Sequence, residues 1–145
     1  MQFEGDKDLP LPPKEAFAKL SDARFLGECI PGREAIVRAE PHEAVVVQRP
    51  PFAFVGGKLE LTIRVLEATP DVIKLAQHAK GIGTTSDVES VVTLTPRDDG
   101  GTHLHWKAEV KNLGGLLKMV PTGLIRGAAQ KTISDVWQEV EKRLK

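Results

Sequence analysis

The chain has 145 residues, of which 20 are Lys or Arg and 20 are Asp or Glu, so its formal net charge at pH 7 is zero. A balanced charge provides no bulk attraction to nucleic acid or to an anionic membrane, and we expect no nucleic-acid partner. The length predicts one domain over residues 1–145, large enough to remove about two-thirds of the unfolded chain's surface from water.

The single cysteine, Cys29, has no second thiol with which to form an internal disulfide, which is typical of a reducing compartment. Residues 1–8 are acidic, whereas a secretory signal begins with basic residues and continues with apolar ones. No apolar run approaches the ~20 residues that a membrane-spanning helix needs. We therefore expect a cytoplasmic protein with no transmembrane segment.

The first third of the chain predicts one strand and two short helices. Residues 2–9 form the strand, which the prolines at 10, 12 and 13 end. Pro13 suits the first turn of a helix over residues 14–20, because its missing N–H has no helical partner there. Ser21 is predicted to cap a second helix that runs to Glu28, and Ile30 leaves the helical conformation because it precedes a proline.

The middle of the chain, residues 35–110, predicts only strands. In residues 58–65, for example, apolar and polar side chains alternate and one face is apolar. Short turns such as residues 98–101 (DDGG) join the segments, and short connections require antiparallel neighbours. The expected sheet has seven antiparallel strands, formed by residues 2–9, 36–39, 44–48, 58–65, 73–79, 88–94 and 104–110.

The last third predicts one long helix. Between Leu117 and Leu144 apolar residues recur every three or four positions, which indicates a helix of roughly eight turns. A helix of this length needs a broad apolar surface, and the sheet is the only one that the chain offers. The fold class is therefore α+β, in the order β-α-α-β-β-β-β-β-β-α. A sheet that curves around a single helix is built around an internal cavity.

Several segments resemble one known family. Residues 9–32 (LPLPPKEAFAKLSDARFLGECIPG) resemble, without a gap, the opening of the G-subunit family of carbon monoxide dehydrogenase, which ends in Cys-Ile-Pro-Gly. Residues 124–131 (LIRGAAQK) resemble the family's helix signature, and shorter matches are Gly57-Lys58, Lys80-Gly81, residues 93–96 and Gly114-Gly115. The resemblance implies the helix-grip fold of the START-domain, polyketide cyclase-like superfamily over nearly the whole chain.

The resemblance also implies a function. Proteins of this superfamily are largely non-enzymatic carriers of apolar ligands. The G-subunit proteins are accessory to molybdenum hydroxylases and are linked to quinone binding and to membrane attachment. Longer members reach the membrane through a C-terminal extension, whereas this sequence ends at Lys145, so we expect at most peripheral contact with the inner face of the cell membrane. Residues 50–55 (PPFAFV) are also more apolar than the hairpin usual in the family.

A binding cavity between sheet and helix is the candidate site. Gln77 and Ser90 interrupt inward rows that are otherwise apolar, and we expect them to orient the polar end of a ligand. The predicted ligand-binding residues are Phe52, Phe54, Leu61, Ile63, Leu75, Gln77, Val88, Ser90, Leu104, Trp106, Leu117, Val120 and Leu124.

The start of the long helix is predicted to act as a lid. Residues 114–127 contain four glycines and Pro121, and both residue types weaken a helix relative to alanine. The hairpin that carries Phe52 and Phe54 is expected at the same end of the fold. An alternative is a bent helix with both phenylalanines folded into the core.

The groups able to do chemistry do not favour catalysis. Cys29 lies at a helix end beside Ile30 and Pro31, and we expect a buried, unreactive thiol. His103 and His105 share a strand face with charged residues, so we expect solvated side chains and no metal. We predict no cofactor and no catalytic residue. The alternatives are a cyclase- or hydrolase-type enzyme on the same fold, and a docking factor that acts through residues 52–55 without a ligand.

Overall fold

The computed structural model describes residues 1–49, 57–81 and 83–144. The predicted ligand residues Phe52 and Phe54 lie outside the described residues, as does the hairpin that contains them. The described elements are β1 (Gln2–Leu9), α1 (Pro13–Leu20), α2 (Ala23–Glu28), β2 (Arg33–Ala39), β3 (Glu43–Gln48), β4 (Leu59–Thr69), β5 (Val72–Gly81), β6 (Thr84–Pro96), β7 (Thr102–Gly115), the 3₁₀ helix η1 (Leu116–Met119) and α3 (Thr122–Arg143).

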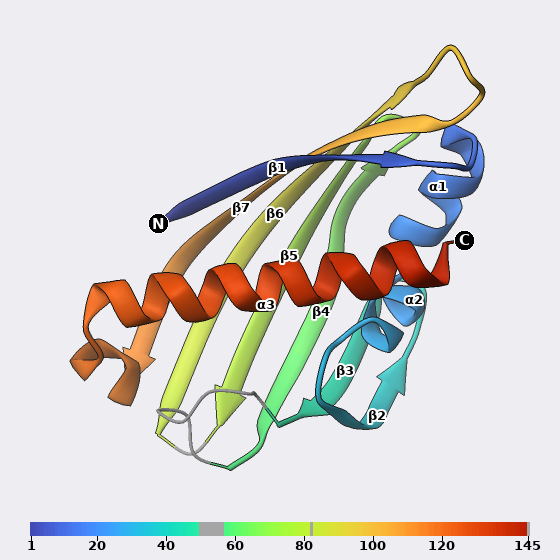
Figure 1. Cartoon of the computed structure of the whole chain (residues 1–145). Coiled ribbons are helices and arrows are strands. Elements are labelled where there is room, and N and C mark those ends of the chain that lie inside the picture. The colour runs from blue at the N-terminus through green and yellow to red at the C-terminus, as the bar shows by residue number, and fades with distance from the viewer. Residues whose placement is uncertain (50–56, 82, 145) are drawn as a thin grey trace.

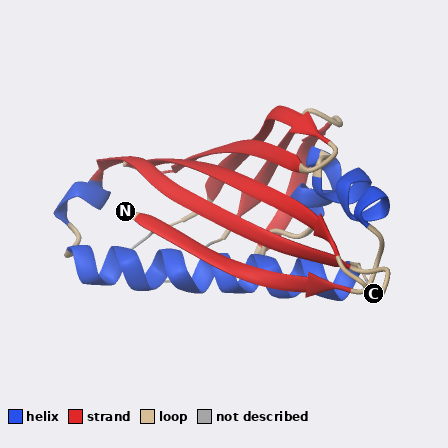
Figure 2. Cartoon of the chain, turned by 90° about the horizontal axis from the view of Figure 1, so that it is seen from above, coloured by secondary structure: helices blue, strands red, loops and turns tan. Residues whose placement is uncertain are grey.

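The sheet is antiparallel throughout and has the strand order β1-β7-β6-β5-β4-β3-β2. This confirms the predicted α+β class, the seven strands and the helix-grip arrangement. Figure 1 shows α3 running across the sheet. The view from above in Figure 2 shows α1 and α2 near the C-terminal end of α3, and η1 near its N-terminal end.

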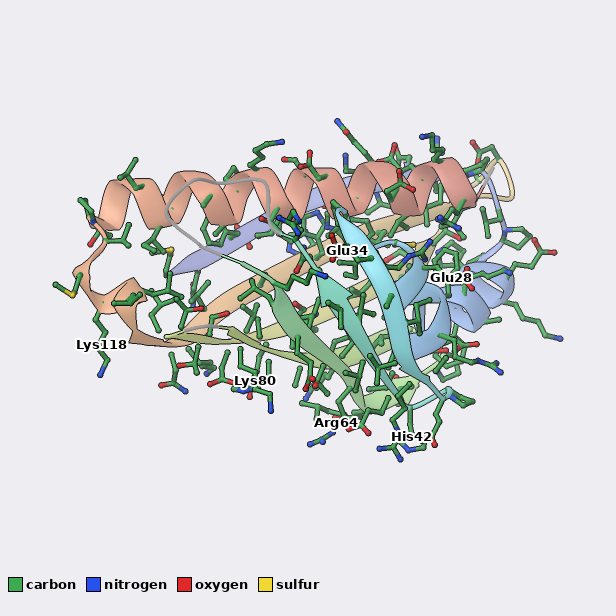
Figure 3. All side chains as sticks on the ribbon, turned by 90° about the horizontal axis from the view of Figure 1, so that it is seen from below. Glu28, Glu34, His42, Arg64, Lys80 and Lys118 are labelled. Carbon is green, nitrogen blue, oxygen red and sulfur yellow. The ribbon has the colours of Figure 1, made fainter. Side chains whose placement is uncertain are left out.

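Alternation along the strands separates an apolar concave face from a charged convex face. On β4, for example, Ile63 is buried and the next residue, Arg64, is exposed. Figure 3 shows Arg64 and Lys80 on the side of the sheet away from α3. On that side Arg64 pairs with Glu43 at 2.7 Å. Exposed ion pairs of this kind stabilise a fold by at most about 1 kcal/mol each, so the apolar face supplies most of the driving force.

The two short helices form where the sequence predicts them, but one cap differs. Pro13 begins α1. The cap of α2 is Asp22, whose carboxylate accepts the N–H of Arg24 at 2.9 Å. The prediction of Ser21 as the cap is wrong, because its hydroxyl donates back to the carbonyl of Phe17 at 2.6 Å and is not available to α2.

The C-terminal helix is shorter than the apolar stripe predicts. It begins at Thr122, and the stripe residues before it lie in η1 (Leu117) and in the link that follows η1 (Val120). Val120 is extended (φ −84°, ψ 134°) because it precedes Pro121, and a residue before proline disfavours the helical conformation. The predicted continuous helix from Leu117 is therefore wrong, and of the segment 114–127 that was predicted to act as a lid only residues 122–127 are part of α3. That this segment acts as a lid stays a prediction. Gly114 and Gly115 end β7.

The main core lies at the end of the molecule where α1 and α2 pack. Its most deeply buried side chains come from β1, both short helices, three further strands and the last turns of α3. They include Leu9, Leu20, Cys29, Ile73, Leu104 and Val140, each at most 2% exposed. The C-terminal half of α3 is thus held in the core. In the described part of the chain, no helix is long and apolar enough to cross a membrane.

Alanine substitutions of two glycines, Gly115 at the end of β7 and Gly127 within α3, should change the free energy of unfolding in opposite directions. Gly127 lies inside α3, and a Cβ there meets no atom within 4 Å, so Gly127→Ala should stabilise the protein by about 0.5–1 kcal/mol. Gly115 has φ +63°, and a Cβ there would overlap the carbonyl oxygen of Gly83. Gly115→Ala should destabilise by more than about 1 kcal/mol. Urea unfolding of both variants measures the two changes, and a stabilised Gly115→Ala would contradict this account.

Candidate functional site

A cavity of about 300 Å³ lies between the concave face of the sheet and α3. Its walls are almost entirely apolar, and Lys107 is the only charged residue among the described lining residues. Lys107 is exposed and alternates with the buried Trp106 and Ala108, so it belongs to the outward row. Leu20, Leu26 and Ile30 close the end of the cavity nearest α1 and α2. The volume is at the lower end of the range typical of small-molecule pockets.

Most of the predicted sheet residues lie together on the cavity wall. The predicted residues found there are Leu61, Ile63, Leu75, Gln77, Val88, Ser90, Trp106 and Leu117. Each strand residue occupies an inward position because side chains on a strand alternate between the two faces. Leu117 reaches the wall from η1, not from a helix that crosses the sheet.

Three predicted residues lie elsewhere. Leu104 faces inward but is fully buried in the main core, beyond the cavity. Val120 is in the extended link between η1 and α3 and is not a lining residue. Leu124, in the first turn of α3, is 56% exposed and is not a lining residue. The prediction for Val120 extends a regular helical period back through Pro121, and the chain does not follow that period.

The inward face of α3 begins one residue later than the sequence predicts. Ile125 is buried and lines the cavity, and the residues that continue its row are Ala128, Ala129, Thr132, Ile133 and Val136. Steps of three and four residues connect them, so the row is an ordinary helix face.

The uncharged polar side chains among the described lining residues are Gln48, Gln77, Thr84, Thr85, Ser86, Ser90 and Thr132. Gln48 donates to the carbonyl of Pro31 at 3.0 Å and is satisfied. The hydroxyl of Ser90 donates to the amide oxygen of Gln77 over 3.4 Å, a long hydrogen bond. Gln77 and Ser90 are both predicted ligand-binding residues. Among the described residues of that predicted set, no other two side chains form a hydrogen bond with each other.

The indole N–H of the lining residue Trp106 is buried against Gly5 of β1. This side chain is 7% exposed, and its Nε1 has no hydrogen-bond partner in the described part of the molecule. An unpaired buried donor costs about 1–3 kcal/mol. The ring is nevertheless held firmly, because it packs over Gly5 of β1 and lies 6.0 Å from the ring of Trp137. The sequence identified Trp106 only as an apolar wall residue.

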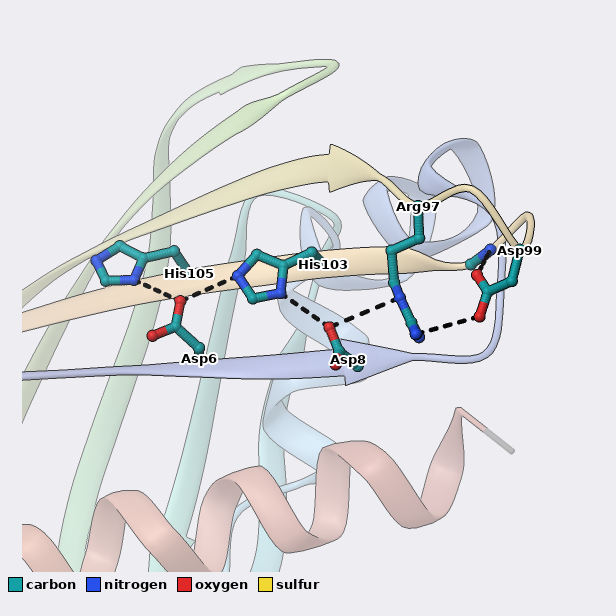
Figure 4. Close-up of polar contacts among 7 residues, drawn as sticks. Asp6, Asp8, Arg97, Asp99, His103 and His105 are labelled. Atoms are coloured by element: carbon teal, nitrogen blue, oxygen red, sulfur yellow. Dashed lines mark hydrogen bonds and ion pairs between the residues drawn. The ribbon is translucent and has the colours of Figure 1, made fainter.

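A charged network lies on the outer face of the sheet, where β1 meets β7 (Figure 4). His103 contacts Asp8 at 2.8 Å and Asp6 at 3.0 Å, and His105 contacts Asp6 at 2.9 Å. Hydrogen bonds to the carboxylates of Asp8 and Asp6 raise the pKa of His103. A hydrogen bond from His105 lowers the pKa of Asp6. The neighbouring strand thus supplies carboxylates that the sequence analysis did not anticipate. No group of three or more ligand-type side chains able to hold a metal is present among the described residues.

Cys29 is the one thiol of the chain, and its side chain is fully buried in the core. Burial raises the pKa of Cys29 to about 11. A thiol is nucleophilic only as the thiolate, so this environment suppresses its reactivity at neutral pH. Cys29 caps the end of α2 and is not a cavity-lining residue.

Comparison with known protein families matches residues 5–145 to the family described as the G subunit of carbon monoxide dehydrogenase (CoxG). The chain belongs to the CoxG family. A crystal structure of a conserved protein from Geobacillus kaustophilus is 25% identical, with a TM-score of 0.84, over 99% of this chain and 95% of that one. Comparison with curated proteins gave no match.

The helix-grip fold of this CoxG protein also has a counterpart in the START superfamily. A START superfamily protein from Mycobacterium smegmatis is 13% identical, with a TM-score of 0.68, over 99% of this chain and 96% of that one. At this identity the likeness concerns the fold alone.

The Cys29 thiol should be inert in the native protein. Iodoacetamide at neutral pH should modify Cys29 only as fast as the protein unfolds, because the thiol is buried and its pKa is raised. Cys29→Ala should lower the free energy of unfolding by no more than about 2 kcal/mol, as small core truncations do. Mass spectrometry follows the labelling, with denatured protein as the rapid control, and equally fast labelling of both would refute the prediction.

The network of β1 and β7 should make stability depend on pH in two directions. The raised pKa of His103 means that its contribution is present below about pH 6.5 and is lost as pH rises through the folded pKa. The pKa values of Asp6 and Asp8 are lowered in the folded protein. The contribution of these two carboxylates to stability is therefore present above about pH 3.9 and is lost as the pH falls through their folded pKa values.

His103→Gln should therefore lower the melting temperature more at about pH 5 than at about pH 9. Thermal unfolding at both pH values measures the difference. His42→Gln is the matched control, because His42 is in the turn between β2 and β3 and is 72% exposed. An equal effect of His103→Gln at both pH values would show that the ion pairs do not hold β1.

Proposed function

We propose that the cavity binds a hydrophobic small molecule and does not transform it. The observation that carries this proposal is the apolar cavity of about 300 Å³ between the sheet and α3. Removing apolar surface from water contributes roughly 25 cal/mol per Å², so a ligand that fills the cavity gains affinity without specific contacts. Membership of the CoxG family supports an accessory role for this binding.

The finer proposal concerns the ligand and the partner. An isoprenoid quinone combines an apolar tail with polar carbonyl groups, and the Gln77–Ser90 pair offers a polar contact on the sheet wall. The family's description names carbon monoxide dehydrogenase. We therefore propose that the protein serves a molybdenum hydroxylase of that type by binding such a molecule.

An enzymatic role receives less support from the cavity wall. General acid–base catalysis requires a titratable side chain within hydrogen-bond reach of the reacting group. Among the described lining residues there is no Asp, Glu, His, Cys or Tyr. Ser86, Ser90 and the threonines of the wall have no base beside them in that set, so none is activated as a nucleophile.

Docking to a partner is the second candidate, because one corner of the molecule exposes large apolar side chains. Leu116 and Met119 of η1 are 55% and 81% exposed, and Leu124 of α3 is exposed beside them in sequence. Leu117, between the first two, lines the cavity, so this corner adjoins the proposed site. Docking through these residues would not need an empty cavity. A variant with a filled cavity therefore distinguishes docking from ligand binding.

Filling the cavity tests the binding proposal. Ala128 lines the cavity from α3, whereas Gln130, on the same helix, is exposed. Ala128→Phe should weaken binding of the neutral fluorescent probe N-phenyl-1-naphthylamine by at least about tenfold, a change of about 1.4 kcal/mol. Gln130→Phe adds the same group outside the cavity and should leave the affinity unchanged.

Fluorescence titration of the wild type and both variants measures these affinities. The binding proposal fails if the wild type does not bind the probe, or if Ala128→Phe binds it as well as the wild type does. Ala128→Phe leaves the exposed Leu116, Met119 and Leu124 intact. A variant that loses probe binding and keeps association with a hydroxylase would favour docking as a separate activity.

A further inference from the structure

The sheet wall of the cavity is less deeply buried toward the end of the molecule where η1 lies. Side chains on the inner face of the sheet fall in rows that run across the strands. One row in the main core, formed by Ile73, Val92 and Trp106, is buried throughout. A row two residues before the end of β7, where η1 begins, is only half-buried, and its members are Leu61, Ala79, Ser86 and Leu113. The cavity therefore opens toward η1.

The cavity is short compared with many apolar molecules. Its volume is about 300 Å³. A methylene group takes about the space of a water molecule in the liquid, ~30 Å³, so the cavity holds a chain of roughly ten such groups. Leu20, Leu26 and Ile30 close the end near α1 and α2. A longer molecule must therefore leave the cavity toward η1.

Apolar side chains continue the cavity wall beyond this opening. Leu117 of η1 and Ile125 of α3 line the cavity. Their neighbours in the chain, Leu116 and Leu124, are exposed to solvent. Met119 is the most exposed large apolar residue in the described part of the chain. An apolar surface thus begins inside the cavity and extends onto the outside of the molecule.

The geometry of η1 gives its side chains three different directions. A 3₁₀ helix has three residues per turn, so Leu116 and Met119, three positions apart, lie on the same side. Leu117 lines the cavity, and Figure 3 shows Lys118 pointing away from α3. The N–H of Leu116 donates to the carbonyl of Gly83 at 2.6 Å, which ties η1 to the turn between β5 and β6. The exposed side chains are therefore held in place beside the opening.

We propose that Leu116, Met119 and Leu124 form an outer subsite, which binds the part of a long apolar ligand that the cavity does not hold. One segment of such a ligand lies inside the cavity, and a flexible hydrocarbon chain continues over these three side chains. The inference rests on the proposed binding function and adds to it a second contact surface outside the cavity.

The charge of this part of the chain disfavours a second copy of the protein as the occupant. Residues 110–134 contain four cationic side chains and no acidic one. Two of the cations, Lys118 and Arg126, lie close in sequence to the exposed apolar residues. A symmetric dimer through this surface would bring like charges together, which is unfavourable. A neutral hydrocarbon chain meets no such repulsion, and the continuity of the surface with the cavity wall favours the ligand itself.

Straight-chain alcohols of increasing length test the proposal. Octan-1-ol, decan-1-ol, dodecan-1-ol and tetradecan-1-ol are titrated against protein that holds N-phenyl-1-naphthylamine, and displacement of the probe gives their affinities. A fully buried methylene strengthens binding about fourfold, and one that lies on a surface with half its area covered about twofold. The affinity of the wild type should therefore rise steeply up to decan-1-ol and should rise by a further factor of about four from dodecan-1-ol to tetradecan-1-ol.

A double variant, Met119→Ser with Leu124→Ser, removes the outer subsite. Both side chains are exposed, so the substitutions remove no core packing. The variant should weaken binding of tetradecan-1-ol about fourfold more than binding of octan-1-ol, because only the longer chain reaches the outer surface. Leu66→Ser is the matched control, because Leu66 of β4 is 53% exposed and does not line the cavity. It should leave the dependence on chain length unchanged.

The outcomes separate this inference from the function on which it rests. If the wild-type affinity stops rising beyond decan-1-ol, the outer surface binds no chain and the inference is overturned, while the binding function stands. A double variant with the wild-type dependence on chain length would also overturn it, because the chain then leaves the cavity elsewhere. If that variant in addition loses association with a hydroxylase, the exposed side chains serve docking instead. If the wild type does not bind the probe and no alcohol binds, the binding function fails and the inference fails with it.

Discussion

Burial of the last turns of α3 in the main core is the constraint on which the rest of the structure depends. Val140 is 1% exposed and packs in a cluster with Leu20 of α1 and Cys29 at the end of α2. This contact fixes one end of α3, and Ile125 is the next deeply buried residue toward the other end. Between them the helix spans the concave sheet, and the space that the side chains leave open is the cavity.

This arrangement explains why a cavity can persist in a stable protein. Well-packed interiors have few voids, and each lost contact lowers stability. Here the deepest packing is where β1, α1, α2 and the end of α3 meet, and small residues of α3 such as Ala128, Ala129 and Thr132 leave space above the sheet. Val140 belongs to both the core and the cavity wall, so the same helix face contributes to stability and shapes the cavity.

The apolar wall also gives the few polar groups their importance. In a site with low local dielectric, a hydrogen bond is stronger and an unpaired donor is more costly than in water. Polar lining residues such as Gln77 and Ser90 are therefore positions at which ligands of equal size would be distinguished, while the aliphatic residues contribute affinity.

Local rules predict much of this fold, and the failures have physical causes. Strand alternation predicts that Leu61 and Ile63 face the cavity, as they do, because successive side chains on a strand point to opposite faces of the sheet. The prediction for Val120 is wrong because it gives the apolar stripe more weight than Pro121, which keeps the residue before it out of the helix. The contact of Asp6 with His103 joins residues 97 apart, and only the pairing of the first strand with the last brings them together. The unpaired N–H of Trp106 depends on every neighbour of the ring, which sequence alone does not provide.

The most direct measurement of the central claim is native mass spectrometry of the protein purified from cells that make it, before and after extraction with organic solvent. A ligand-binding cavity predicts a non-covalent adduct that extraction removes and that is identified in the extract as an apolar molecule. A bare polypeptide mass before extraction, together with a crystal structure in which the protein's own side chains fill the space under α3, would contradict it.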